Sequence, residues 1–193
     1  MQHRNIPLTN IDRARLQCPV PELPDGKNLS YDSAALSLMV NLDHIFCVSR
    51  DMTLNHALEI IRSSSLKTLI VIGQETEFVG VLRATDIMGR KPTIIAAEQQ
   101  IHRDEIKIDD IMVPKHSLHA LSYSQVLQSM LGDVLTTLRN LGEPELLVVD
   151  GIDNGYRVRG ILSAAIIAHH LHADFEPHCP APTFATLYAT LRV

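Results

Sequence analysis

Tryptophan is absent from the chain, and aromatic residues make up only 4% of its 193 positions. Proteins that hold single-stranded nucleic acids commonly stack the bases on aromatic side chains, so we expect no stacking surface for single strands or sugars. Cysteine is also scarce. Cys18, Cys47 and Cys179 are odd in number and far apart, and they form neither a metal-type nor a redox CxxC pair. We therefore expect reduced thiols.

Long hydrophobic runs are missing too. No stretch approaches the ~18 apolar residues that cross a membrane as a helix. The first residues, MQHRNIPLTNIDRARL, lack the apolar core of a secretory signal. The formal net charge is −5, with both signs scattered along the chain and no basic face, which argues against nucleic acid or a membrane surface as a partner. These absences predict a cytoplasmic protein.

The common motifs of catalysis are absent as well. The sequence contains no GxGxxG, GxxxxGK[ST] or GxSxG, and no spacing indicates a Ser–His–Asp triad or paired carboxylates. We expect no catalytic residues and no enzyme activity. His169 and His172 share a helical face at a spacing that a metal ion can use. Histidines near a helix C-terminus also interact favourably with the helix dipole, and we predict no metal site.

What the sequence does contain is an internal repeat. LSLMVNLDHIFCVSRDMTL near the start resembles the later DDIMVPKHSLHALSYSQVL, and this alignment places Leu54 on Leu127. TLIVIG then matches ELLVVD, and GVLRATDI matches GILSAAII. The separation between matched segments grows along the chain, which predicts two insertions in the second copy. One is a helical turn before the ELLVVD strand, and the other lengthens the loop DGIDNGYRVRG.

Each copy has the periodicity of a β-α-β-β-α unit. A short strand (IFCVS or LHALS) leads to an amphipathic helix, whose apolar spacing covers 54–61 in the first copy and 126–138 in the second. Gly132 interrupts the second of these helices. Two β-rich strands joined by a polar turn follow. A second helix then opens at Thr85 or Asp86, and the second copy has its counterpart.

A unit of roughly 60 residues buries its sheet poorly alone. We therefore predict an α/β (α+β) fold in which two repeats pack sheet to sheet about a pseudo-twofold axis, with helices outside. The predicted divisions are an extended or partly disordered N-terminal arm (1–32), the first repeat (33–96), a solvated helix or linker (97–110), the second repeat (111–173) and a C-terminal tail (174–193).

The motifs that carry a family resemblance are SLMVN and DDIMVP before the two copies, DMTLNHALEIIRSSSLKTLIVI, and EFVGVLRATDIMGRKP. In this order, repeated twice over about 36–173, they resemble a tandem pair of CBS domains, or Bateman module, of the stand-alone bacterial type. The resemblance implies a sensor rather than a catalyst, because many CBS pairs bind adenine nucleotides in clefts between the two copies. It also implies a homodimer formed through the helices.

The resemblance further implies a ligand site at the end of the third strand. In the family pattern, a glycine, two hydrophobic residues, a Thr or Ser, two further residues and an Asp stand there, and Gly80 to Asp86 fill these positions. Asp86 would accept the ribose hydroxyls, as a carboxylate can, and the N–H groups of the following helix suit a phosphate. Arg83 replaces the expected hydroxyl, and it either grips a phosphate or fills the cleft. The other implied candidates are Thr85, Lys67, Thr68, Val48 and Ile45, the last three as walls of the adenine site.

The second copy departs further from the pattern. It keeps Gly160 and Ser163, but Ile166 stands where the ribose carboxylate belongs, and Pro144 stands where the first copy has Lys67. We predict one ligand site per chain and one degenerate site. Ser163 is included in the predicted site because the two clefts of such a pair lie close together around the pseudo-twofold axis.

Each candidate also has a purely structural explanation. Asp86 is well placed as a helix N-cap or first-turn carboxylate, and Lys67 as an exposed turn lysine. The structural alternative for Arg83 is a salt bridge at the surface or at a dimer interface. The predicted function is a cytoplasmic sensor of AMP, ADP or ATP that requires no cofactor and signals through two arrangements of its repeats. The alternative is a scaffold with decayed nucleotide sites that contacts an effector protein through the arm or the tail.

Overall fold

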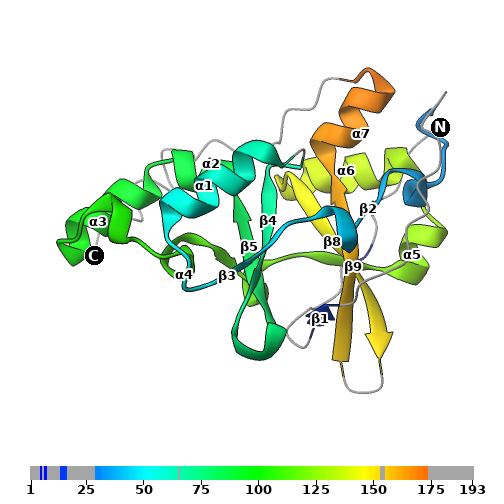
Figure 1. Cartoon of the computed structure of the whole chain (residues 1–193). Helices are drawn as coiled ribbons and strands as arrows, with labels where there is room; N and C mark the ends of the chain where they lie inside the picture. Colours follow the sequence, from blue (N-terminus) through cyan, green and yellow to red (C-terminus); the bar gives the residue numbers. More distant parts are fainter. Residues whose placement is uncertain are drawn as a thin grey trace, which may run out of the picture.

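The structure contains two β-sheets, and helices cover their outer faces (Figure 1). The computed structural model describes residues 29–64, 66–152 and 155–173, together with Asn5, Pro7 and 14–16. The first sheet has the strand order β3-β4-β5-β6, and the second has the order β1-β9-β8-β7 with β2 also paired to β9. The strands are β1 (Ala14–Leu16), β2 (Val40–Asn41), β3 (Cys47–Ser49), β4 (Thr68–Ile72), β5 (Phe78–Arg83), β6 (Val113–Pro114), β7 (Ala120–Ser122), β8 (Glu145–Ile152) and β9 (Gly155–Ser163).

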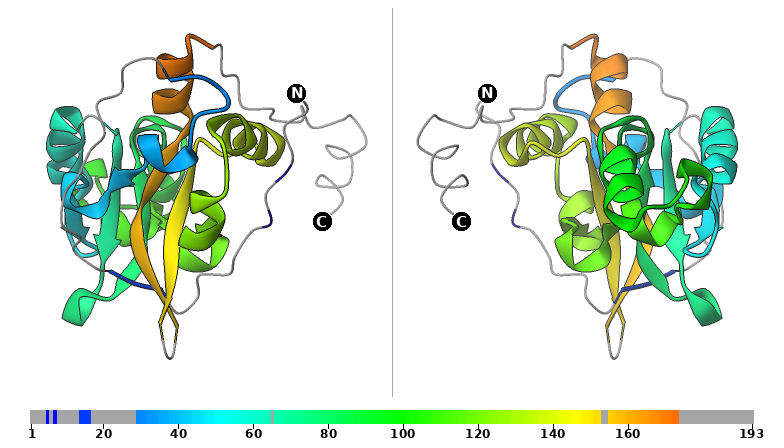
Figure 2. Two further views of the ribbon diagram at one scale, coloured as in Figure 1. Left: turned by 90° about the vertical axis from the view of Figure 1, so that its right-hand side faces the viewer. Right: turned by 90° about the vertical axis from the view of Figure 1, so that its left-hand side faces the viewer.

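The helices of each copy follow its strands in the predicted order. The α-helices are α1 (Leu54–Ser63), α2 (Ala84–Met88), α3 (Lys91–Gln99), α4 (Ile108–Ile111), α5 (Tyr123–Leu127), α6 (Leu131–Leu141) and α7 (Ala164–Leu171). Short 3₁₀ helices lie at Ala35–Leu38, Leu42–His44, Gln74–Thr76, Arg103–Glu105 and Lys115–Ser117. The predicted fold class, with two β-α-β-β-α copies, is confirmed. The β8–β9 hairpin extends as a long ribbon beyond the other strands (Figure 2).

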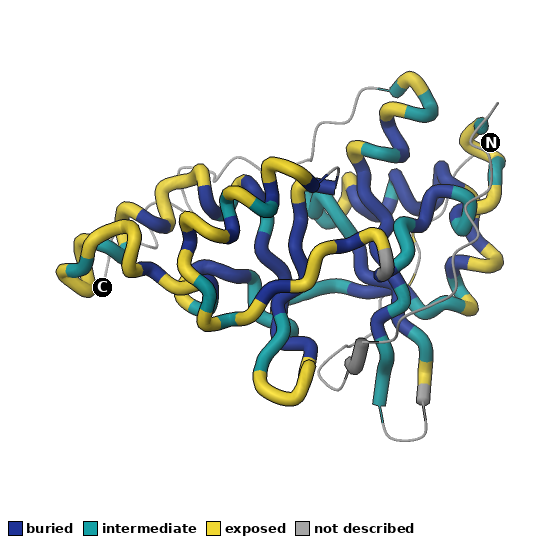
Figure 3. The backbone as a smooth tube through the Cα atoms, in the orientation of Figure 1, coloured by how far each residue is buried: buried dark blue, intermediate teal, exposed yellow. Residues whose placement is uncertain are grey.

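Alternation along the central strands builds a sandwich, because successive side chains of a strand point to opposite faces. In β4, Leu69 packs with the helices of its own repeat, whereas Ile70 packs against the other sheet. In β8, Leu146 faces its helices and Leu147 faces the first sheet. All four side chains are buried, and Figure 3 shows buried residues filling the strands between more exposed helices. The two repeats therefore pack sheet to sheet with helices outside, as predicted.

The strand that precedes each copy pairs with the sheet of the other copy. β6 runs antiparallel to β5 opposite Gly80 and Val81, and β2 runs antiparallel to β9 opposite Gly160 and Ile161. The two short strands thus pair at corresponding positions of β5 and β9, as a pseudo-twofold relation between the copies requires. Neither short strand was predicted, since two residues are too few to show a period.

Gly80 and Gly160 allow this exchange. A Cβ atom on Gly80 would lie 2.3 Å from the carbonyl oxygen of Val113, and one on Gly160 would lie 2.4 Å from that of Val40. These distances are far inside van der Waals contact, so only glycine lets the exchanged strand approach. Gly80, predicted as part of a ligand motif, thus has a structural role.

The helical turn inserted in the second copy lies earlier than predicted. It is α5, between β7 and α6, rather than a turn before β8. Consequently Leu54, the first residue of α1, corresponds to Leu131, the first residue of α6, and not to Leu127. Leu54 and Leu131 are both fully buried, whereas Leu127 is exposed. The helix is also interrupted before Leu131 rather than at Gly132, which lies inside α6.

The segment 97–110 was wrongly predicted to be solvated throughout. Ile106 and Ile108 are fully buried in the core of the first repeat. The backbone N–H of Leu54 donates to the carbonyl of Ile106, and that of Ile108 donates to the carbonyl of Met52. The two isoleucines are separated by one exposed lysine, which hides their common burial from a helical reading of the sequence.

Parts of the predicted N-terminal arm are ordered against the second repeat. β1 pairs in parallel with β9, with Ala14 opposite Tyr156. The Gln125 side-chain amide donates to the carbonyl of Pro7 at 2.9 Å. The predicted tail, 174–193, lies outside the described residues, and the repeat boundaries remain predictions.

Candidate functional site at the junction of the two repeats

The candidate site lies where corresponding strand ends of the two repeats meet. Thr68 begins β4 directly opposite Arg83, which ends β5. In the second repeat Glu145 begins β8 directly opposite Ser163, which ends β9. Thr68 and Glu145 therefore hold equivalent positions, and so do Arg83 and Ser163.

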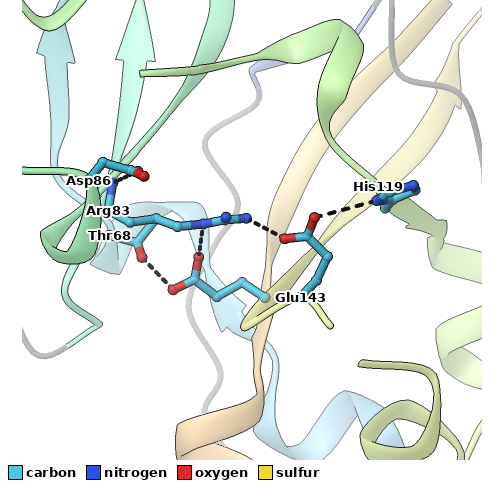
Figure 4. A network of polar contacts seen from close by, with 6 residues as sticks. Thr68, Arg83, Asp86, His119 and Glu143 are labelled. Atoms are coloured by element: carbon cyan, nitrogen blue, oxygen red, sulfur yellow. Dashed lines mark hydrogen bonds and ion pairs between the residues drawn. The ribbon is translucent and has the colours of Figure 1, made fainter. Parts of the chain in front are cut away.

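A chain of polar contacts crosses this junction (Figure 4). Arg83 donates from Nη2 to Oε2 of Glu143 at 2.9 Å and from Nε to Oε2 of Glu145 at 3.3 Å. The hydroxyl of Thr68 donates to Oε1 of Glu145. On the far side of Glu143, its Oε1 lies 3.9 Å from Nδ1 of His119. Two side chains of the first repeat thus hold two carboxylates of the second.

This network is largely shielded from solvent. The side chains of Glu145, Arg83 and Glu143 are 12%, 15% and 25% exposed, and Thr68 is fully buried. Burial raises the pKa of Glu145 above the ordinary carboxyl range, although the hydrogen bond from Thr68 and the charge of Arg83 act to lower it. Burial is the larger influence on this carboxylate.

Asp86 lies in the first turn of α2 and caps it. Its Oδ2 accepts the backbone N–H of Arg83 at 3.0 Å, as the sequence's structural alternative supposed. Asp86 is partly exposed, and its carboxylate lies beside Arg83 (Figure 4). A helix of only five residues does not provide the phosphate-binding N-terminus that the sequence suggested.

Arg83 forms salt bridges, and both of its partners belong to the same chain. Its guanidinium neither projects into solvent nor pairs with its own repeat; it reaches across to Glu143 and Glu145. Both contacts carry full charges in a partly buried setting, where ionic hydrogen bonds are stronger than at a free surface. The side chain therefore fastens the two repeats together.

Lys67 points to a different part of the fold. Its ammonium donates to the carbonyl oxygens of Arg62 at 2.9 Å and Ile61 at 3.4 Å, at the C-terminus of α1. A cation suits that end of a helix. The lysine has φ of 57°, and its own carbonyl accepts the N–H of Ala84. This arrangement directs its charge to α1.

The remaining predicted residues do not join the network. Ser163 is 4% exposed and precedes α7, while Thr85 is exposed in α2. Ile45 and Val48 are 5% and 2% exposed and belong to two different cores. Their roles as ligand contacts stay predictions.

Sequence reasoning missed Glu143, Glu145 and His119. A signal for Glu145 was present: a carboxylate opens a strand that is otherwise buried, at the repeat position held by Thr68. Glu143 and His119 lie in loops, and only the packing of the repeats brings them to Arg83.

Within 29–64, 66–152 and 155–173, no three His, Cys, Asp or Glu side chains gather as they would around a metal ion. No helix in the same part of the chain has the length and apolar character needed to span a membrane.

The comparison with protein families identifies the first repeat. Residues 37–92 match the sequence profile of the CBS domain family. The first repeat is thus similar to a CBS domain. The matched segment covers the exchanged strand β2, all of β3, β4 and β5, and helices α1 and α2. Arg83 ends β5, and Asp86 lies in α2. No curated protein matches the chain.

Solved structures of similar fold cover about three quarters of the chain. An uncharacterised conserved protein from Pyrococcus horikoshii has a TM-score of 0.54 at 16% identity, covering 77% of this chain and 98% of that one. CBSX2 of Arabidopsis thaliana, solved in complex with AMP, has a TM-score of 0.53 at 20% identity, covering 71% and 94%. A hemolysin-like CBS protein of Oenococcus oeni has 0.51 at 20% identity, covering 73% and 91%. The chain is thus similar in fold to a tandem CBS pair.

Proposed function

We propose that this CBS-domain protein is a regulatory module that binds an adenine nucleotide around Arg83 and Asp86 and signals by altering how its two repeats pack. The observation that carries the proposal is the convergence of both repeats on Arg83, which contacts Glu143 and Glu145 directly. A ligand that engages Arg83 competes with contacts that hold the repeats together.

The AMP complex of CBSX2 supports the choice of ligand class, because that protein has a similar fold. Within this chain, Asp86 offers a partly exposed carboxylate for a ribose diol. Ile166 offers none at the corresponding place. We accordingly assign one nucleotide site to each chain.

Signalling then follows from differential affinity. A ligand shifts a two-state equilibrium only as far as it binds one state better than the other. Here the packing of the two repeats is held by Arg83 and by the bond from Thr68 to Glu145. The proposal includes a cytoplasmic homodimer, a regulatory rather than catalytic role, and an effector protein as recipient of the signal.

The test is thermal unfolding and calorimetric titration of the full chain with AMP, ADP and ATP, using Asp86→Ala and a matched control. Asp110 is that control, since its Oδ2 caps α4 through the N–H of Lys107 at 3.1 Å, as Asp86 caps α2. Both variants lose a cap, which costs about 0.5–2 kcal/mol. Only Asp86→Ala is expected to lose nucleotide binding as well.

At a nucleotide concentration of roughly 100 times Kd, binding adds about 2.7 kcal/mol to the free energy of unfolding. The wild type and Asp110→Ala should both show this gain. No response of the wild type to any of the three nucleotides at millimolar concentration would refute the proposed function.

A protein-interaction module without a nucleotide is the second candidate, and the pairing of Arg83 favours it. Both basic candidates of the site, Arg83 and Lys67, are already engaged by protein acceptors. This candidate predicts that Arg83→Met leaves an effector complex intact and that removal of 1–32 or 174–193 abolishes it. A nucleotide-dependent change in effector affinity would contradict it.

A further inference from the structure

We propose that Glu143 and Glu145 determine which nucleotide the junction accepts, favouring one phosphate over three. The inference rests on the proposed function and adds a ranking of ligands to it: AMP binds more tightly than ADP, and ADP more tightly than ATP. The two carboxylates become specificity-determining residues.

The first step is the balance of charge at the junction. Asp86, Glu143 and Glu145 all contact Arg83, through its backbone N–H or its guanidinium. Two carboxylates thus contact the guanidinium, and a third contacts the backbone of the same residue. Lys67, the second basic candidate, directs its ammonium to α1. The immediate surroundings of Arg83 therefore carry an excess of negative charge before any ligand arrives.

The charged side chains of the junction are also largely buried. Glu145 and Arg83 are 12% and 15% exposed, so water and salt screen their interactions with a bound anion less than at an open surface. The raised pKa of Glu145 reflects the same poor solvation. A phosphate group placed beside Arg83 consequently feels the neighbouring carboxylates strongly.

The third step is displacement. Two nitrogens of Arg83 already donate to carboxylates of the second repeat, Nη2 to Glu143 at 2.9 Å and Nε to Glu145 at 3.3 Å. A phosphate must displace one carboxylate or share the guanidinium with it. One phosphate exchanges one anionic partner of the guanidinium for another, whereas each further phosphate adds repulsion from the carboxylates that no described cation of this network offsets.

The experiment is calorimetric titration of the full chain with AMP, ADP and ATP, without divalent cations and at one pH. The variants are Glu143→Gln, Glu145→Gln and the pair combined. Glu77→Gln is the matched control, because it removes the same charge from an exposed carboxylate paired with Lys115. Urea unfolding of each variant confirms folding, and Glu143→Gln, at the more exposed position, leaves the bond from Thr68 to Glu145 in place.

For the wild type we expect AMP to bind at least roughly tenfold more tightly than ATP. The combined variant should strengthen ATP binding more than AMP binding and narrow this ratio, while Glu77→Gln leaves it unchanged. Equal or tighter binding of ATP by the wild type overturns the inference but leaves the proposed function standing, and so does an unchanged ratio in the combined variant. If no nucleotide binds any variant, the proposed function fails first, and the inference with it.

Discussion

Thr68 and Glu145 occupy equivalent positions in the two repeats, and their side chains meet in a hydrogen bond across the junction. In a perfectly symmetric pair this contact would join two identical side chains. If both positions held glutamate, the two carboxylates would repel each other. If both held threonine, Arg83 would lack the carboxylate that Glu145 supplies. The divergence of the two copies therefore creates a complementary contact where identical copies would not.

The ion pair between Arg83 and Glu145 is expected to stabilise the packing of the repeats. Arg83→Met leaves two partly buried carboxylates without their cation, and we expect it to cost about 1.5–3 kcal/mol of unfolding free energy. A double-mutant cycle with Glu145→Gln, measured by urea unfolding, should give a clear coupling energy. The matched cycle for Lys115 and Glu77, an exposed pair at 2.8 Å, should give about 0–1 kcal/mol. Equal coupling in both cycles would contradict this account.

Glu145 should also make the protein less stable as the pH rises. Its pKa is raised in the folded state, mainly by burial, so the folded protein holds a proton at pH values where the unfolded chain has released it. That contribution is complete below the ordinary carboxyl pKa and declines as the pH rises through the raised value. Glu145→Gln should remove this decline from a series of urea unfolding curves across the acidic range.

The matched control for that series is Glu77, which titrates in the opposite sense. The hydrogen bond and charge of Lys115 lower its pKa, so its contribution is present above the ordinary carboxyl pKa and is lost as the pH falls through the lowered value. Glu77→Gln should leave the decline due to Glu145 unchanged. If the unfolding free energy of Glu145→Gln declined with rising pH as much as that of the wild type, a group other than Glu145 would be its cause.

Gly80 and Gly160 should be indispensable for strand exchange. An alanine Cβ at either position would meet a backbone carbonyl oxygen at 2.3 or 2.4 Å, and backbone cannot yield as a flexible side chain does. We expect Gly80→Ala and Gly160→Ala each to cost about 1–3 kcal/mol or more. Gly151→Ala is the control, since no heavy atom lies within 4 Å of its added Cβ, and it should change the unfolding free energy by less than about 0.5 kcal/mol.

The sequence predicted the fold where its local pattern was strong. The β-rich apolar runs TLIVI and ELLVVD predicted β4 and β8, and helical spacing predicted α1. It misplaced α5 because Leu127 continues an apolar series although the chain turns at Gln128 to Met130 before α6 begins. Only the burial of Leu131 and the exposure of Leu127 distinguish the two alignments.

The sequence predicted the site residues Arg83 and Asp86 of the first repeat, but it did not predict the two carboxylates that the second repeat contributes. The position of Arg83 and Asp86 follows from the repeat, and the capping role of Asp86 was one of its stated alternatives. Which acceptor Arg83 contacts depends on how the sheets pack, because Glu143 and Glu145 belong to the other repeat and are some sixty residues away in sequence. Local patterns carry no information on that contact.

The segment predicted as a linker should prove to be part of the first core. Ile108 is fully buried against that core, and its backbone N–H is bonded to Met52. We expect Ile108→Ala to cost about 2–5 kcal/mol, as cavity-forming substitutions do. Ile94→Ala makes the same chemical change at a position that is 52% exposed, so it should alter the unfolding free energy by less than about 0.5 kcal/mol. Urea unfolding of the two variants decides the matter, since a solvated linker would give them equal and small effects.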